Sequence, residues 1–385
     1  MITQLVNAVV VSFGMFWEIL WALILGFGLS AVIQAVASRR QMSKLLPNDS
    51  PKSIAIATGL GAASSSCSYA SVAIARSLFR KGADFTSAIV FEFASTNLVI
   101  ELGIIMWLLL GWQFTLAEFI GGPVMIIILV IIFRIFLKKS LVEKARKQAD
   151  KGVVGVMEGH AEMNMSQDKG TLFQKATSKQ GVTSISHYFV MDWISVWKDI
   201  ALGLLIAGAL AAWVPNSFWQ SFFFTSNHTL STIWGPIIGP IVSMISFVCS
   251  IGNVPLAAVL WNGGISFGGV ISFIYADLLI LPILNIYRKY YGIAMTVFLT
   301  MSSYVAIVLA GFFTEVLFGW LHLIPTTRHA LEMSSGISLN YTTVLNMIFV
   351  ILAMLLVTRF YKTGGIKMLR MMNSHAEHHH EHSGH

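Results

Sequence analysis

The chain has 385 residues, of which 56% are hydrophobic and only 11% are charged. Soluble domains carry about 25% charged residues, so this composition excludes an ordinary soluble fold and indicates a protein whose surface is largely covered by lipid. The net charge of +7 does not indicate a nucleic-acid partner, because the basic residues flank apolar runs, as in the cytoplasmic loops of membrane proteins.

Nine apolar runs follow one another along the chain, each long enough, at about 20 residues or more, to span a bilayer as a helix. Two runs are interrupted, the second at Cys67-Ser68 after several serines and the sixth at Cys249-Ser250. We therefore predict an all-α polytopic membrane protein. The runs are residues 5–36, 53–78, 85–110, 114–137, 191–214, 230–262, 266–286, 292–321 and 341–361.

The placement of Lys and Arg distinguishes two topologies. If all nine runs cross the membrane, the basic clusters fall on both sides. If the second and sixth runs are re-entrant hairpins, every cluster falls on one side, which the positive-inside rule identifies as the cytoplasm. We predict about seven full spans and two re-entrant hairpins, with nine or more crossing helices as the alternative. The expected location is the inner (plasma) membrane, multi-pass, with the N-terminus outside and the C-terminus cytoplasmic.

An internal repeat supports the hairpin topology. Cys67 precedes Gly82 by fifteen residues, and Cys249 precedes Gly264 by the same spacing, with an offset of 182 positions between the copies. In the predicted topology the copies have opposite orientations, as in the inverted repeats of many secondary transporters. The predicted divisions are a first membrane repeat (1–137), a cytoplasmic loop (138–188), a second membrane repeat (189–321), an extracytoplasmic loop (322–338), a final transmembrane helix (339–363) and a His-rich cytoplasmic tail (364–385).

The two hairpin tips are candidate substrate sites. Non-helical backbone is tolerated within a membrane only inside protein or beside a water-filled cavity. The half-helices after the tips would also point positive N-terminal ends at a ligand. A thiolate binds thiophilic metals and, by extension, trivalent metalloids, although a free cysteine is as often an ordinary buried residue. The candidate substrate-binding residues are Cys67, Ser68, Ser95, Thr96, Asn97, Cys249, Ser250 and Asn253.

Ionisable residues inside apolar runs are functional candidates by default. Asp277 lies near the middle of the seventh run, opposite Ser95 of the first repeat. Glu92 and Glu101 lie nine positions apart in the third run, on opposite faces of an ideal helix, so they share one cavity only if the helix is unwound between them. A carboxyl group that burial keeps neutral can carry a proton. The candidates for binding a coupling ion are Asp277, Glu92 and Glu101.

The histidines are concentrated in the tail, with six of the eleven in residues 375–385. Such a tract either binds metal weakly or is inert, and both interpretations remain open. The candidate ligands are His375, His378, His379, His380 and His382. The sequence contains no P-loop, HExxH or GxSxG pattern, so we expect neither an enzyme nor a bound cofactor.

The segments around the tips form a recognisable pattern: residues 66–68, 80–82 and 94–97 in the first copy, and residues 248–257, 263–264 and Pro282 in the second. This pattern resembles the ArsP-type predicted permease family of organoarsenical efflux proteins, over residues 17–137 and 197–321. The resemblance implies an inner-membrane permease that exports trivalent organoarsenicals, with Cys67 and Cys249 in the matching cysteine segments.

The chain differs from the family pattern at two places, which suggests a distinct subgroup. Residues 67–71 lack a second cysteine and a following proline, and Asp277 replaces a small residue or proline. We predict a secondary transporter that exports a small toxic solute, with a small-molecule or metalloid substrate and the lipid bilayer as partners. The alternatives are an exporter of soft metal cations, a membrane-embedded enzyme or chaperone, and a channel.

Overall fold

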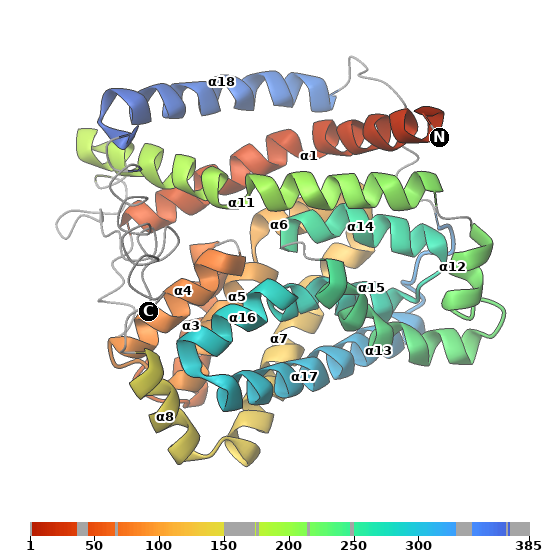
Figure 1. Ribbon diagram of the computed structural model, residues 1–385, viewed down its shortest axis with the longest axis horizontal. Coiled ribbons are helices and arrows are strands. Elements are labelled where there is room, and N and C mark those ends of the chain that lie inside the picture. Colours follow the sequence, from red (N-terminus) through yellow and green to blue (C-terminus); the bar gives the residue numbers. More distant parts are fainter. Residues whose placement is uncertain are drawn as a thin grey trace, which may run out of the picture.

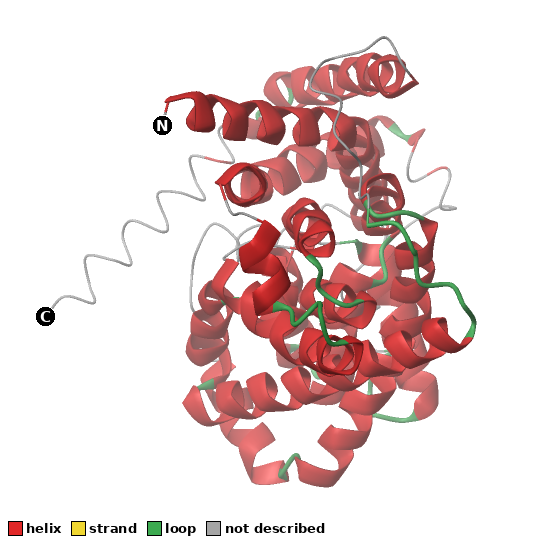
Figure 2. Ribbon diagram, turned by 90° about the vertical axis from the view of Figure 1, so that its right-hand side faces the viewer, coloured by secondary structure: helices red, strands yellow, loops and turns green. Residues whose placement is uncertain are grey.

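The computed structural model describes residues 2–36, 45–65, 68–149, 174, 177–213, 216–246, 250–328, 341–366 and 369. Within these residues the chain forms helices joined by turns and loops, and Figure 2 shows no strand among them. Five helical segments are long and apolar enough to cross a membrane, or six if one bent pair of helices counts as a single span. The prediction of an all-helical, multi-pass membrane protein is confirmed at this level.

Each predicted apolar run corresponds to one helix or to a pair of helices separated by a break. The breaks lie at the second, third, sixth and seventh runs. The principal helices are α1 (Ile2–Val36), α3 (Pro51–Ser64), α4 (Ser68–Arg80), α5 (Phe85–Asn97), α6 (Ile100–Leu109), α7 (Trp112–Phe136), α8 (Lys139–Ala149), α11 (Lys179–Trp213), α12 (Asn216–Phe222), α13 (His228–Ser246), α14 (Ser250–Gly263), α15 (Phe267–Tyr275), the 3-10 helix η1 (Ala276–Leu279), α16 (Leu281–Tyr291), α17 (Ile293–Trp320) and α18 (Tyr341–Lys362).

Three long helices form a layer along one side of the molecule. In Figure 1, α18, α1 and α11 run side by side across the top, and α18 packs on both of the others. Helix α11 begins at Lys179, well before the predicted start at residue 191. Its polar first turns are stabilised by the end of α18, where Arg359 donates to the Lys179 carbonyl at 2.7 Å and His187 contacts Thr363 at 2.8 Å.

The start of α3 and the end of α4, which together form the first hairpin, lie next to each other. The Asp84 amide, after α4, donates to the Leu46 carbonyl, before α3, at 2.9 Å. The Ser87 hydroxyl donates to the Asn48 carbonyl at 2.7 Å. The two helices therefore run out and return, and the end of α3 at Ser64 and the start of α4 at Ser68 lie at the far end of the pair.

The second hairpin, α13 and α14, has the same form. Gly264, directly after α14, lies against Thr225, just before α13, so closely that a Cβ on the glycine would be 2.4 Å from the threonine Cγ2. Gly264 also has a φ of +109°, a region that favours glycine. The residues at the two ends of this hairpin are thus also neighbours.

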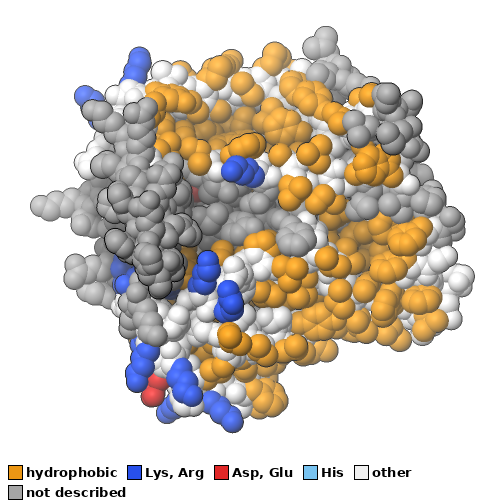
Figure 3. Space-filling model, viewed as in Figure 1, with side chains coloured by type: hydrophobic (Ala, Val, Ile, Leu, Met, Phe, Trp, Pro, Cys, Tyr) orange, Lys and Arg blue, Asp and Glu red, His pale blue; other side chains and the backbone are white. Residues whose placement is uncertain are grey.

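The basic residues at several helix ends gather at one end of the molecule. Helix α8 packs against α4, α16 and α17. Arg76 donates to the Ala149 carbonyl at 2.7 Å, and Gln148 donates to the Lys289 carbonyl at 3.2 Å. In Figure 3, the Lys and Arg side chains visible on this face lie mainly toward the left, where Figure 1 places α8, whereas hydrophobic side chains cover much of the centre and right. We call this region the cation-rich end.

Candidate functional site

Asp277 lies where the seventh apolar run bends. Helix α15 passes into the short 3-10 helix η1, and α16 starts with Pro282 in its first turn. Proline has no backbone N–H and clashes with the carbonyl of a preceding turn, so it favours a kink or break at this point of the run. The bend places the Asp277 side chain, which is fully buried, among other broken helices.

Two polar residues from the first half of the chain hydrogen-bond to the Asp277 carboxylate. The Ser68 hydroxyl donates to Oδ2 at 2.7 Å, and Asn97 Nδ2 lies 3.5 Å from Oδ1. Ser68 is the first residue of α4, directly after the hairpin tip, and Asn97 is the last residue of α5, directly before the break at Leu98. Three broken helices therefore converge on one buried carboxylate.

Two further predicted site residues, Thr96 and Ser95, are fully buried and directly precede Asn97 in the chain. Asn97 Nδ2 lies 3.2 Å from the Thr96 hydroxyl. The Ser95 hydroxyl pairs with the Ser71 hydroxyl of α4 at 2.7 Å. These contacts join α4 to α5, and they keep Ser95–Asn97 within the last turn of α5 instead of unwound; the unwinding follows directly after, at Leu98.

The second hairpin has its own polar contacts. Asn253 Nδ2 donates to Ser243 Oγ at 3.2 Å, and the Ser246 hydroxyl donates to Asn253 Oδ1 at 3.3 Å. Asn253 therefore joins the two arms of this hairpin. Ser250 is buried at the start of α14. Cys67 and Cys249 lie outside the described residues, next to Ser68 and Ser250 respectively, as do the five candidate metal ligands of the tail.

The predicted coupling residues Glu92 and Glu101 are separated by the break between α5 and α6. Glu92 is fully buried in α5, where it accepts a hydrogen bond from the Tyr287 hydroxyl. Glu101 lies in the first turn of α6, where the helix dipole favours a negative charge. A third buried carboxylate, Glu118 of α7, escaped the sequence prediction, although its position in the fourth apolar run was sufficient to mark it.

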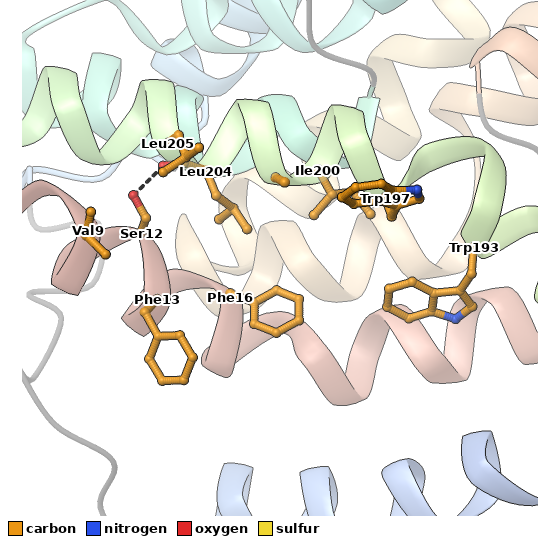
Figure 4. Close-up of a pocket in the computed structure, with 10 residues that line it drawn as sticks. Val9, Ser12, Phe13, Phe16, Trp193, Trp197, Ile200, Leu204 and Leu205 are labelled. Carbon is orange, nitrogen blue, oxygen red and sulfur yellow. Dashed lines mark hydrogen bonds between the residues drawn. The ribbon is translucent and has the colours of Figure 1, made fainter.

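An apolar cavity of about 410 Å³ lies between α1 and α11. Figure 4 shows Phe16 and Trp193 with other apolar side chains around it, and the Ser12 hydroxyl donating to the Leu204 carbonyl at 2.8 Å. That hydroxyl also bonds within α1, to the Ala8 carbonyl, so it ties the two helices together. Convergent buried polar groups lie instead around Asp277.

A helical membrane protein with broken helices around a buried carboxylate is the architecture expected of a permease. The family described as predicted permease matches residues 4–316, and the chain belongs to this ArsP-type family. The chain is also 59% identical over 348 residues to the Mycobacterium tuberculosis (strain ATCC 25618 / H37Rv) protein named "Putative permease Rv2963", covering 90% of this chain and 86% of the relative. No solved structure matches the chain. By family, the chain is therefore a membrane transporter.

Proposed function

We propose that this permease is a secondary transporter that exports a small toxic solute, with the solute bound between the two hairpin tips. The contact of Ser68 and Asn97 with Asp277 carries this proposal. It connects a hairpin tip of one half of the chain to a buried ionisable group of the other half. A solute that enters between the tips therefore meets the group best placed to respond to a coupling ion.

The proposed transport mechanism requires two related halves, and equivalent contacts support them. Arg146 donates to the Phe79 and Ala83 carbonyls at 2.5 and 3.2 Å, and Arg328 donates to the Trp261 and Ile265 carbonyls at 3.2 and 3.0 Å. Each guanidinium also lies over the aromatic ring of its site, at 3.9 Å and 4.6 Å from the ring centroid. All three pairs of positions differ by 182, the offset between Cys67 and Cys249.

The helix starts that follow the two hairpins repeat at the same offset. The Asp84 carboxylate accepts from the Ser87 amide at the start of α5, and the Ser266 hydroxyl accepts from the Gly269 amide at the start of α15. The preceding turns contain glycines with φ of +101° and +109°. The two halves therefore share their turn and capping chemistry in spite of weak sequence identity.

Aromatic contacts between the halves support an inverted orientation. The segment α5–α6 is one candidate span, so its two ends lie at opposite faces. Phe114, just beyond α6, packs on Trp261 and Phe267 at 5.0 and 4.6 Å, and these two residues flank the turn between α14 and α15. The α14–α15 turn thus lies opposite the α4–α5 turn. In the same way, Tyr291, at the end of α16, packs on Phe79 and Phe85, which flank the α4–α5 turn.

These contacts support the finer topology that we propose. Both hairpins start and end on one side of the membrane, as re-entrant segments, and the remaining runs supply about seven spans. The cation-rich end then faces the cytoplasm by the positive-inside rule. This orientation places the N-terminus outside, the C-terminus inside, and the protein in the inner membrane. Rocking of one inverted repeat against the other would expose the site to each side in turn.

The proposed substrate is a trivalent organoarsenical. In the sequence, Cys67 and Cys249 each directly precede a buried serine at the start of a half-helix, and in this proposal their thiolates contribute to the solute site. Thiolates are suitable ligands for a soft, trivalent metalloid. Ser68, Ser95, Thr96, Asn97, Ser250 and Asn253 line the same region in this proposal, and Asp277, with Glu92 and Glu101 as further candidates, binds the coupling ion.

Resistance and flux measurements test the proposal together. Cells that express the wild-type protein should tolerate methylarsonous acid better than cells that express Cys67→Ser or Cys249→Ser. Inverted vesicles should accumulate methylarsonous acid when a pH gradient is imposed, and Asp277→Asn should abolish this accumulation. Glu143→Gln, on the exposed surface of α8, is the matched carboxyl control and should transport normally.

Three outcomes contradict the proposal. Flux without accumulation would indicate a channel. Resistance to copper or silver, without resistance to the arsenical, would indicate a soft metal cation exporter. Normal, equally pH-dependent transport by Asp277→Asn would remove Asp277 from the mechanism.

A further inference from the structure

Glu118 of α7 is a buried carboxylate without a role in the proposed solute site. Its side chain is fully buried, and neither carboxylate oxygen has a hydrogen-bond partner among the residues that the structure describes. A charged carboxylate in this position costs several kcal/mol or more, because the loss of hydration is not offset by a partner. Glu118 is therefore stable here as a neutral acid with a proton bound.

The bend that carries Asp277 faces Glu118. The Tyr275 hydroxyl donates to the backbone carbonyls of Glu118 and Ala117 at 2.9 and 3.4 Å. Asp277 lies two residues beyond this tyrosine, in η1 of the same bend. Tyr275 and Asp277 are the titratable groups that face Glu118 from the described helices around it, and no cation among those residues acts on it.

Glu92 has the corresponding position on the other side of Asp277, with which it also interacts electrostatically. One Glu92 oxygen accepts from the Tyr287 hydroxyl, and the other has no partner among the described residues. The Tyr287 ring stacks with Tyr291, with centroids 6.2 Å apart. Tyr291 ends α16 and lies beside Phe85, at the cation-rich end. Two stacked tyrosines thus lie between Glu92 and that end.

The three carboxylates lie at successive depths. At a rise of about 1.5 Å per residue, Glu92 lies roughly 10 Å from the start of α5 at the cation-rich end. Asp277 lies roughly 15 Å from the start of α15 at the opposite end, and Glu118 lies roughly 9 Å from the start of α7 at that same end. The order across the membrane is therefore Glu92, Asp277, Glu118.

We propose that Glu118, Asp277 and Glu92 form a proton path across the protein, in which Glu118 exchanges protons with the side opposite the cation-rich end. The inference rests on the proposed function, because Asp277 is the central group of both. In the elementary step one O–H bond of Glu118 breaks and one forms on Asp277. The proton changes carboxylates, and the net charge of the pair is unchanged.

Infrared spectroscopy tests the path without any substrate. In pH-difference spectra of the protein in lipid, the carbonyl stretching band of protonated carboxyl groups should lose one component in Glu118→Gln. The control is Glu315→Gln, a buried carboxylate of α17 that already accepts from the Gly268 amide, and it should leave that component in place. An unchanged band in Glu118→Gln would overturn the proposal.

Transport in proteoliposomes tests the role of the path. Glu118→Gln should retain exchange of labelled methylarsonous acid across the membrane but lose at least tenfold of the accumulation that a pH gradient drives. Glu118→Asp keeps a carboxyl group and should recover part of the accumulation. Such a recovery excludes misfolding as the cause of the loss in Glu118→Gln. Full accumulation by Glu118→Gln, or accumulation that follows a sodium gradient instead, would overturn the path. If wild type carries no methylarsonous acid, the proposed substrate fails, and the infrared result still decides the path.

Discussion

At the scale of single residues, the site depends on the groups that hydrogen-bond to the buried Asp277 carboxylate. Asp277 accepts hydrogen bonds from Ser68, the first residue of α4, and from Asn97, the last residue of α5. A hydrogen bond to a charged group stabilises it by about 1.5–3 kcal/mol. The charge state and orientation of Asp277 therefore depend on whether the tip residue Ser68 remains in contact.

Ser68→Ala should slow transport more than it lowers stability. Loss of the 2.7 Å hydrogen bond to Asp277 should reduce proton-driven accumulation by roughly tenfold, which corresponds to about 1.4 kcal/mol. Ser87→Ala is the control, because it removes a hydrogen bond of equal length to the Asn48 carbonyl at the base of the hairpin. Equal transport by the two variants would exclude a special role for Ser68.

A glycine at the base of the second hairpin should be irreplaceable. Gly264→Ala puts a side chain at a φ of +109° and against Thr225, so it should lower the free energy of unfolding by roughly 1–3 kcal/mol. Gly59→Ala, within α3 and with no neighbouring atom within 4 Å, should instead stabilise by roughly 0.5–1 kcal/mol. Thermal unfolding in detergent measures both, and a stable Gly264→Ala variant would contradict the argument.

At the scale of elements, the two hairpins are held at their bases by the same kind of contact. Each base is bound by an arginine that donates to carbonyls on both sides of a glycine turn, Arg146 for α3–α4 and Arg328 for α13–α14. In each turn, one of these carbonyls lies in the last turn of the helix and also accepts from the turn glycine, and the other lies beyond the helix. The guanidinium group bridges the two carbonyls and so holds the helix end and the following turn together.

Arg146→Ala should destabilise the protein more than Arg134→Ala. The first change removes two hydrogen bonds and a contact with the Phe79 ring, an expected loss of roughly 1–2 kcal/mol. Arg134 pairs with Asp49 at 2.9 Å on the surface, where both side chains are more than 40% exposed, and such pairs contribute little. Chemical denaturation of the two variants should rank them in this order, and the reverse order would show that the base contacts are dispensable.

At the scale of the whole molecule, the orientation of the two halves decides the topology. The hairpin bases carry equivalent exposed positions, Arg80 at the end of α4 and Asn262 at the end of α14, 182 residues apart. In an inverted repeat with two re-entrant hairpins these positions face opposite sides of the membrane. If all nine runs cross, both positions face the same side.

Cysteine labelling separates the two topologies. With Cys67 and Cys249 replaced by serine, a membrane-impermeant maleimide should label Asn262→Cys in intact cells. Arg80→Cys should react only after the membrane is permeabilised. Labelling of both positions from the same side would reject the inverted repeat and favour nine or more crossing helices.

Much of this architecture could be predicted from the sequence, because lipid imposes a strong local constraint. Every run of about 20 apolar residues had to become a helix, since helices satisfy their own backbone in a membrane. The interruptions at Ser68 and Ser250 marked breaks for the same reason, and the intramembrane rule singled out Asp277. The same rule applies to Glu118, the single acid of the fourth apolar run, which the sequence prediction left out.

By itself, then, the sequence determined the helices, the breaks in the two hairpins and three of the buried acids, Asp277, Glu92 and Glu101, because hydropathy and helix-breaking residues act within one segment. The breaks at Leu98 and at η1 are findings of the structure. Only the tertiary structure decided which of these groups meet. Ser68 and Asp277 are 209 positions apart and Asn97 and Asp277 are 180 apart, and no local pattern encodes such pairs. They are brought together by helix packing, which depends on the shapes of all the intervening side chains at once.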